Sequence, residues 1–205
     1  MVQLLQSRRY FTTRELLKLY KSHVLGFVEY RTPALYHASA SVLAPLDKLQ
    51  EGFLRDLGLS EQEALANFRL APLGTRRNIA MLGVVLRAVL KKGPPQLHDF
   101  FVRAEKQGTT RSSDWHSLQL KTYRDGEHLE VLKRSVLGLV EVFNVLPTAV
   151  VEGSQKVRSF QAQLQELTLT ASRDGVEDWK ILLNADRSDW ERRTLKQLKG
   201  WKSSR

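Results

Sequence analysis

Residues capable of acid–base or metal chemistry are few and scattered along this chain of 205 residues. There is no cysteine, which excludes disulfides, thiol catalysis and zinc sites built from thiolates. The five histidines show no His-x-x-x-His spacing, no glycine run fits a phosphate-binding loop, and no serine stands in a nucleophile elbow. No two aspartates are adjacent, and Asp186 and Asp189, which can share a helix face, make only a weak metal site. We therefore expect no active site, no metal site and no cofactor.

The chemistry that the composition does favour is the binding of anions. The formal net charge is +10 and the isoelectric point is near 10.0, and nucleic acid is the commonest partner of such basic chains. After a basic lead-in with Arg8 and Arg9, a stripe of Arg14, Lys18 and Lys21 follows at helical spacing. The stripe can follow the phosphates of a nucleic acid, or it can be a solvated helix face, which is the commoner case.

Two further basic groups are candidates for phosphate contact. Arg76 and Arg77 stand where a helix is expected to begin, an end that does not suit positive charge. They should therefore meet either a phosphate or a carboxylate of a neighbouring helix. Lys106 and Arg111 lie in a polar stretch rich in Gly, Ser and Thr, which either orders on binding an anion or serves as a linker.

Hydrophobic spacing predicts that helices position these residues. A first helix is expected over residues 13–30, because Thr12 and Glu15 form a capping box and Pro33 ends the pattern. Its apolar face is predicted to consist of Leu16, Leu17, Tyr20, Val24, Phe27 and Val28. His23, at helical spacing from that face, is expected to be partly packed.

Similar reasoning predicts helices over residues 41–57, 60–69, 75–91, 127–145, 154–171 and 186–205. The 41–57 helix should have Pro45 in its first turn and a buried stripe of Leu46, Leu49, Phe53, Leu54 and Leu57. The 75–91 helix is apolar nearly all round and should be buried on most sides.

Taken together, the helices predict an all-α, irregular bundle around the 75–91 helix, with a C-terminal helical extension. We expect a helical domain over residues 1–102, a basic flexible loop over 103–126 and a helical region over 127–205 that packs on the first. The longest apolar run, residues 79–85, is far shorter than the roughly 20 residues of a bilayer span, so no membrane association is expected.

Several stretches resemble non-LTR (long interspersed) retrotransposon reverse transcriptases in the region just after their catalytic palm. Residues 19–36 contain the run Leu-Tyr-Lys-Ser, then Glu-Tyr, a proline and an aromatic residue, which in that family opens the helical thumb. The family's second run, Leu-Asp-Lys-Leu-Gln, stands here at residues 46–50. The resemblance continues through residues 76–97 and more weakly through 132–165, so it covers most of the chain.

This resemblance implies a thumb that clamps a primer–template duplex without regard to sequence. The chain lacks the adjacent aspartates with which such polymerases hold Mg²⁺, so it is expected not to polymerise by itself. Two alternatives stand beside this interpretation. The chain can be a protein-interaction module whose C-terminal helices present Trp179, Trp190 and Trp201, or an inactive relic of such an element.

Overall fold

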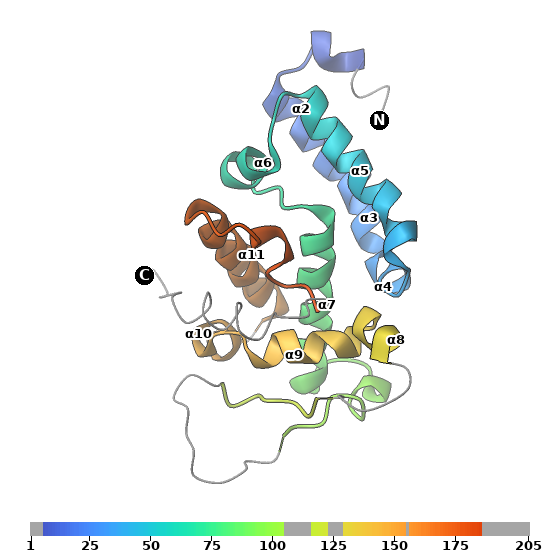
Figure 1. The fold of residues 1–205 in the computed structure, drawn as a ribbon, viewed down its shortest axis with the longest axis vertical. Helices are drawn as coiled ribbons and strands as arrows, with labels where there is room; N and C mark the ends of the chain where they lie inside the picture. The colour runs from blue at the N-terminus through green and yellow to red at the C-terminus, as the bar shows by residue number, and fades with distance from the viewer. Residues whose placement is uncertain (1–5, 105–115, 123–128, 155, 186–205) are drawn as a thin grey trace. The chain divides into compact units, whose positions relative to one another are not determined.

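The computed structural model describes residues 6–104, 116–122, 129–154 and 156–185 (Figure 1). The described residues form helices and a single isolated antiparallel bridge between Arg103 and Leu120, which confirms the predicted all-α class. The chain divides into two compact units, Met1–Arg77 and Asn78–Arg205. The boundary therefore falls inside helix α7 (Leu73–Val89), whereas the sequence predicted a first domain extending to residue 102.

The first unit is built on a helical hairpin (Figure 1). A short 3₁₀ turn, η1 (Ser7–Arg9), precedes one continuous helical rod, and α5 returns beside that rod in the opposite direction. The rod consists of α2 (Thr13–Leu19), η2 (Tyr20–Leu25) and α3 (Gly26–Tyr30). It is followed by α4 (Thr32–Leu35), α5 (Ala40–Asp56) and α6 (Glu61–Phe68). The capping boxes begin α2 at Thr12–Glu15 and α6 at Ser60–Glu63, and the rod ends at Tyr30, as the sequence predicted.

The middle of the rod is a π-helical turn, and it changes which residues face the core. The amide of Gly26 donates to the carbonyl of Lys21, five residues back, so η2 holds more residues per turn than an α-helix. This shift in register buries Leu25 and turns Phe27 outward, where it is 61% exposed. The predicted placement of Phe27 on the apolar face is therefore wrong, because that prediction assumed α-helical spacing throughout. His23, expected to be partly packed, is exposed.

The core of the first unit contains a buried amide at its centre. Gln50 of α5 accepts a hydrogen bond from the Tyr20 hydroxyl at 3.2 Å and donates to the carbonyl of Ala71 at 3.0 Å. The Tyr20 ring stacks on the Phe53 ring, with 4.6 Å between the ring centroids. Burial raises the pKa of the Tyr20 hydroxyl to about 12. Gln50 thus takes the inward position that the sequence assigned to Leu49, which is exposed. Pro45 lies inside α5 and not in its first turn.

The second unit packs short helices around α7 and α11 residues. Its elements after α7 are η3 (Pro95–Leu97), α8 (Leu129–Arg134), η4 (Val136–Gly138), α9 (Leu139–Asn144), α10 (Thr148–Glu152), α11 (Val157–Arg173) and η5 (Trp179–Ile181). Helix α7 is buried along most of its faces, as expected. At Gly83, an added Cβ atom would lie 2.6 Å from the side-chain nitrogen of Gln161, so the Gln161 side chain occupies the space that a larger residue at position 83 would need.

The single helix predicted over residues 127–145 is wrong. The chain is extended at Ser135, whose hydroxyl accepts from the Leu137 amide and starts η4, so α8 and α9 are separate helices. Hydrophobic spacing did not reveal this break, because the sequence has no proline or glycine at Ser135, where the helix is interrupted. Helix α11 is close to its prediction and ends at Arg173, followed by Asp174 as its C-cap and by Gly175 in the left-handed region at a φ of 72°.

Residues 116–122 belong to the segment that the sequence predicted as a flexible loop, and two of them, His116 and Leu120, are buried. His116 is 1% exposed, and its ring lies edge-on to Phe143 at 5.1 Å. Asn144 both donates to and accepts from the backbone of Leu120 at 2.8 Å, and Glu152 accepts from the amide of Ser117 at 2.6 Å. These contacts connect the segment to α9 and α10.

The π turn makes a testable prediction about deletions. Removing Ser22, an exposed residue of η2, should convert the turn to a regular α-helix while both flanking faces keep their direction. We expect this deletion to cost less than about 1 kcal/mol in the free energy of unfolding, measured by urea and far-UV circular dichroism. As a control, deletion of Lys48 from the regular helix α5 rotates half of that helix by about 100° and should cost several-fold more. Equal losses for the two deletions would contradict the π-turn assignment.

Buried His116 predicts a pH dependence of the second unit. Its Nε2 donates to the carbonyl of Phe143 at 2.8 Å, while Nδ1 is buried without a partner among the described residues, and burial lowers the imidazole pKa below 6.5. The His116 imidazole binds a proton more readily in the unfolded chain than in the folded chain. The free energy of unfolding should therefore fall as the pH drops below about 6.5.

The measurement is urea unfolding, followed by tryptophan fluorescence, at several pH values between 5 and 7.5. This window stays above the range of Glu152, whose carboxylate has its pKa lowered by hydrogen bonds from Ser117. The His116→Gln variant should show a flatter profile. A profile as steep as that of the wild type would assign the dependence to other groups.

Candidate nucleic-acid interface

The two predicted basic residues of α2 lie on the surface of the first unit. Arg14 and Lys18 are one helical turn apart, and both side chains are exposed. The acidic residue between them, Glu15, is engaged in the capping box: its carboxylate accepts from the Thr12 amide and hydroxyl at 2.7 Å. These hydrogen bonds lower the pKa of Glu15, and nearby Lys18 contributes to the same shift. The α2 surface therefore presents two cations whose acidic neighbour is directed to the backbone.

Lys21, the third member of the predicted stripe, has a structural partner. Its ammonium donates to the carbonyl of Phe68, the last residue of α6, where the helix leaves unpaired carbonyl groups. Its side chain is half-buried, and burial, together with the charge of Arg76, lowers its pKa. Lys21 therefore attaches α6 to the helical rod. Its role is structural, unlike that of the exposed Arg14 and Lys18.

Arg76 and Arg77 meet carboxylates of neighbouring helices, which is one of the two alternatives that the sequence left open. Arg76 Nε lies 2.5 Å from a carboxylate oxygen of Glu29 on α3. Arg77 makes a two-pronged contact with Asp47 of α5, with both nitrogen–oxygen distances at 2.8 Å, and is only 7% exposed. The two arginines thus fix the start of α7 to both arms of the hairpin.

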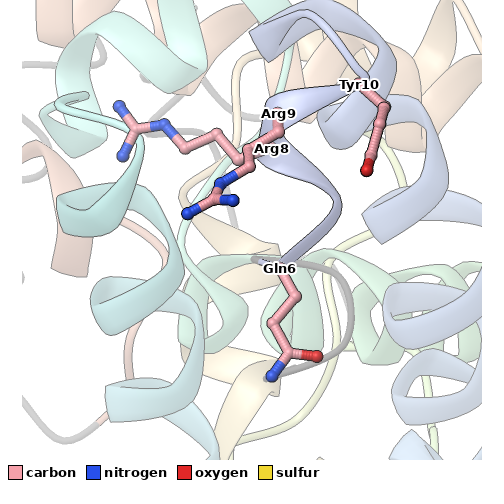
Figure 2. Close-up of a pocket in the computed structure, with 4 residues that line it drawn as sticks. All are labelled: Gln6, Arg8, Arg9 and Tyr10. Atoms are coloured by element: carbon pink, nitrogen blue, oxygen red, sulfur yellow. The ribbon is translucent and has the colours of Figure 1, made fainter.

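A hollow of about 520 Å³ lies at the N-terminal end of the described chain, lined by Gln6, Arg8, Arg9 and Tyr10 (Figure 2). In the view of Figure 2, the guanidinium groups of Arg8 and Arg9 extend to one side of the η1 backbone and the Tyr10 ring to the other. Arg8 Nη1 donates to the carbonyl of Asp56, the last residue of α5, which attaches η1 to the hairpin. The sequence showed Arg8 and Arg9 only as a basic lead-in; the adjacent Arg-Arg-Tyr triplet was the available signal.

The remaining predicted residues divide between buried positions and the undescribed part of the chain. Lys106 and Arg111 lie outside the described residues, as do Trp190 and Trp201 of the alternative protein-binding surface. Trp179, the third tryptophan of that surface, is packed in the second unit at 7% exposure. Among the described residues, the cations of the predicted interface are therefore Arg14 and Lys18, joined by Arg8 and Arg9.

The described residues contain no group of three or more His, Asp or Glu side chains arranged to hold a metal ion. None of the helices described has both the length and the apolar character needed to cross a bilayer. Comparisons with protein families, with curated proteins and with solved structures found no match to this chain.

The two arginine pairs at the start of α7 should differ in their contribution to stability. Asp47→Ala leaves the buried Arg77 guanidinium without a carboxylate, and we expect a loss of about 3 kcal/mol in the free energy of unfolding. Glu29→Ala should cost less than about 1 kcal/mol, because the side chains of Arg76 and Glu29 are 22% and 38% exposed and water screens the pair. Urea denaturation followed by far-UV circular dichroism measures both losses. The interpretation is wrong if Glu29→Ala proves as damaging as Asp47→Ala.

Proposed function

We propose that this chain binds nucleic acid without regard to sequence, through the exposed basic residues at the N-terminal end of the first unit. The observation that carries the proposal is the local charge. Arg8, Arg9, Arg14 and Lys18 fall within eleven residues, all four are exposed, and the acidic residue among them, Glu15, is occupied by the capping box. A net charge of +10 on the whole chain favours the same class of partner.

The four side chains are presented on a fixed scaffold. Arg8 is attached to the end of α5, and Arg14 and Lys18 project from a capped helix whose inner face, at Leu16 and Leu17, is fully packed. From Arg9 to Arg14 the backbone can span at most about 17 Å. A cationic surface of this size can contact several successive phosphates of a nucleic acid, and phosphate contact carries no sequence information.

The resemblance to the thumb of non-LTR retrotransposon reverse transcriptases supports a particular setting for this surface. In that setting the partner is a primer–template duplex, RNA or DNA, and the thumb contributes binding while polymerisation belongs to palm residues that this sequence does not contain. We therefore assign no catalytic step to the chain. The structural roles of Lys21, Arg76 and Arg77 move the proposed contact from the predicted stripe toward its N-terminal end.

Charge reversal tests the proposal. The double variant Arg14→Glu with Lys18→Glu should weaken duplex binding at low salt by about tenfold or more, and should lower the slope of log affinity against log salt by roughly 2. The measurement is fluorescence anisotropy of a labelled duplex titrated at several salt concentrations. The matched control, Lys48→Glu with Arg87→Glu, makes the same change in net charge at exposed positions on α5 and α7. The proposal fails if wild-type protein does not bind the duplex at low salt, or if both double variants lose affinity equally.

A further inference from the structure

We infer that one face of the helical hairpin binds an acidic amphipathic helix of a partner protein. Three exposed apolar side chains define this hairpin face: Phe27 on α3, and Val42 and Leu49 on α5, which are 61%, 59% and 38% exposed. The inference goes beyond the proposed function, because it assigns a second kind of partner to a surface that does not include Arg14 and Lys18.

Two ion pairs mark the opposite face of the hairpin. Consecutive arginines at the start of α7 bind Glu29 of α3 and Asp47 of α5, so these two carboxylates lie on one face. Phe27 is two residues before Glu29, which places it about 160° around α3 from that carboxylate. Leu49 is two residues after Asp47 and Val42 is five before it, which places them about 160° and 140° around α5. All three apolar side chains therefore emerge on the other face of the hairpin.

The residues between the exposed side chains are also apolar. Val24 of η2 and Leu46 of α5 are half-buried and pack against the core of the first unit. Leu46 is one helical turn from both Val42 and Leu49, and Val24 is three residues before Phe27. Single exposed apolar residues are ordinary on a protein surface, whereas a contiguous set favours an interaction site. The hairpin face is such a set, with members from both helices.

The π turn is the reason that Phe27 belongs to this face. With α-helical spacing from the buried Tyr20, seven residues earlier, Phe27 would turn toward the core. The extra residue in η2 rotates it toward solvent instead. Turns of this kind inside helices occur frequently at functional sites. A specific feature of the rod thus exposes the largest apolar ring of the hairpin face, which supports a role in binding.

Arg31 determines the charge of the partner. Its guanidinium carbon lies 3.6 Å from the centroid of the Phe27 ring, and its Nη1 donates to the Phe27 carbonyl at 3.4 Å. These contacts hold an exposed cation beside the apolar side chains. The acidic residues of α3 and of the α5 segment 42–49, Glu29 and Asp47, are bound by arginines on the opposite face. A carboxylate on the partner would therefore meet Arg31 without a competing carboxylate from these segments.

The spacing of the apolar side chains fits a helix. Val42 and Leu49 are seven residues apart, which is about 10.5 Å along α5. A partner helix with apolar residues at i, i+4 and i+7 spans the same distance, and this is a recurring mode of recognition. A nucleic acid fits this face less well, because phosphate contact along a strand requires several cations. A second copy would bring together two chains that each carry a net charge of +10.

A displayed peptide library tests the inference with the full chain. The probes are helices of about 18 residues on yeast, with leucine at the i, i+4 and i+7 positions of one face and Glu, Lys, Ala or Gln elsewhere. We expect the helices that the wild-type chain selects to contain at least about twice as many Glu as Lys. The double variant Phe27→Ser with Leu49→Ser should weaken their binding by about tenfold or more, and Arg31→Glu by about fivefold.

The matched control for the apolar changes is Val102→Ser with Ile181→Ser, because these residues of the second unit are exposed to a similar extent, 43% and 40%. Arg87→Glu is the control for charge, since it reverses an exposed cation on α7. Both controls should bind the selected helices as the wild type does, and circular dichroism verifies that every variant is folded. The inference is overturned by a selection that yields no helix or Lys-rich helices, or by equal losses in the controls and the hairpin-face variants.

Two further measurements separate the other possible occupants. Sedimentation of the wild-type chain alone detects a second copy: a dimer that is lost in the Phe27→Ser, Leu49→Ser variant would assign the face to self-association and overturn the inference. The same variant should keep the duplex affinity of the wild type, and a loss of that affinity would assign the face to nucleic acid instead. Failure of the peptide selection leaves the proposed function in place, because duplex binding depends on Arg14 and Lys18.

Discussion

The first unit depends on one buried amide that three segments share. Gln50 accepts from Tyr20 on the helical rod and donates to the carbonyl of Ala71 in the connection that leads to α7. Its surroundings exclude water, so each of these polar groups would be costly to leave unpaired. The amide therefore fixes the rotation of α5 against the rod, and with it the face on which Arg14 and Lys18 are exposed.

Several basic residues of the first unit have structural partners. Lys21 holds the last carbonyl of α6, where the helix dipole favours positive charge, whereas Arg8 makes one such contact at the end of α5 and its side chain stays exposed. Arg76 and Arg77 are paired with Glu29 and Asp47. Net charge alone thus exaggerates the cationic surface on offer, and the side chains left for an anionic partner gather at one end of the hairpin.

In the second unit, polar side chains hold a segment that has little apolar surface of its own. The packed segment at residues 116–122 carries few apolar side chains, and it is retained by polar groups: His116, Asn144 and Glu152 hydrogen-bond to or from backbone atoms. The Phe143 ring lies between two others: the His116 ring is edge-on to it, and its centroid is 6.3 Å from that of Phe160 on α11. Burial in that arrangement lowers the pKa of the His116 imidazole, and the expected pH dependence of this unit follows from it.

The sequence by itself determined the features that depend on local chemistry. Capping boxes at Thr12 and Ser60, the end of the rod before Pro33 and the apolar α7 helix were predictable, because caps, proline geometry and periodicity act within a few residues. Of the candidate site, the exposed positions of Arg14 and Lys18 agree with the predicted stripe, while its use in binding stays a prediction.

Only the tertiary structure decided which cations are paired and which face the solvent. The partners of Lys21, Arg76 and Arg77 lie 30 to 47 residues away along the chain, so no local pattern reveals them. The π turn at residues 20–25 is equally hidden, since hydrophobic spacing was interpreted with a constant number of residues per turn. Long-range pairing and helix register depend on how segments pack together, and that packing is a property of the folded chain.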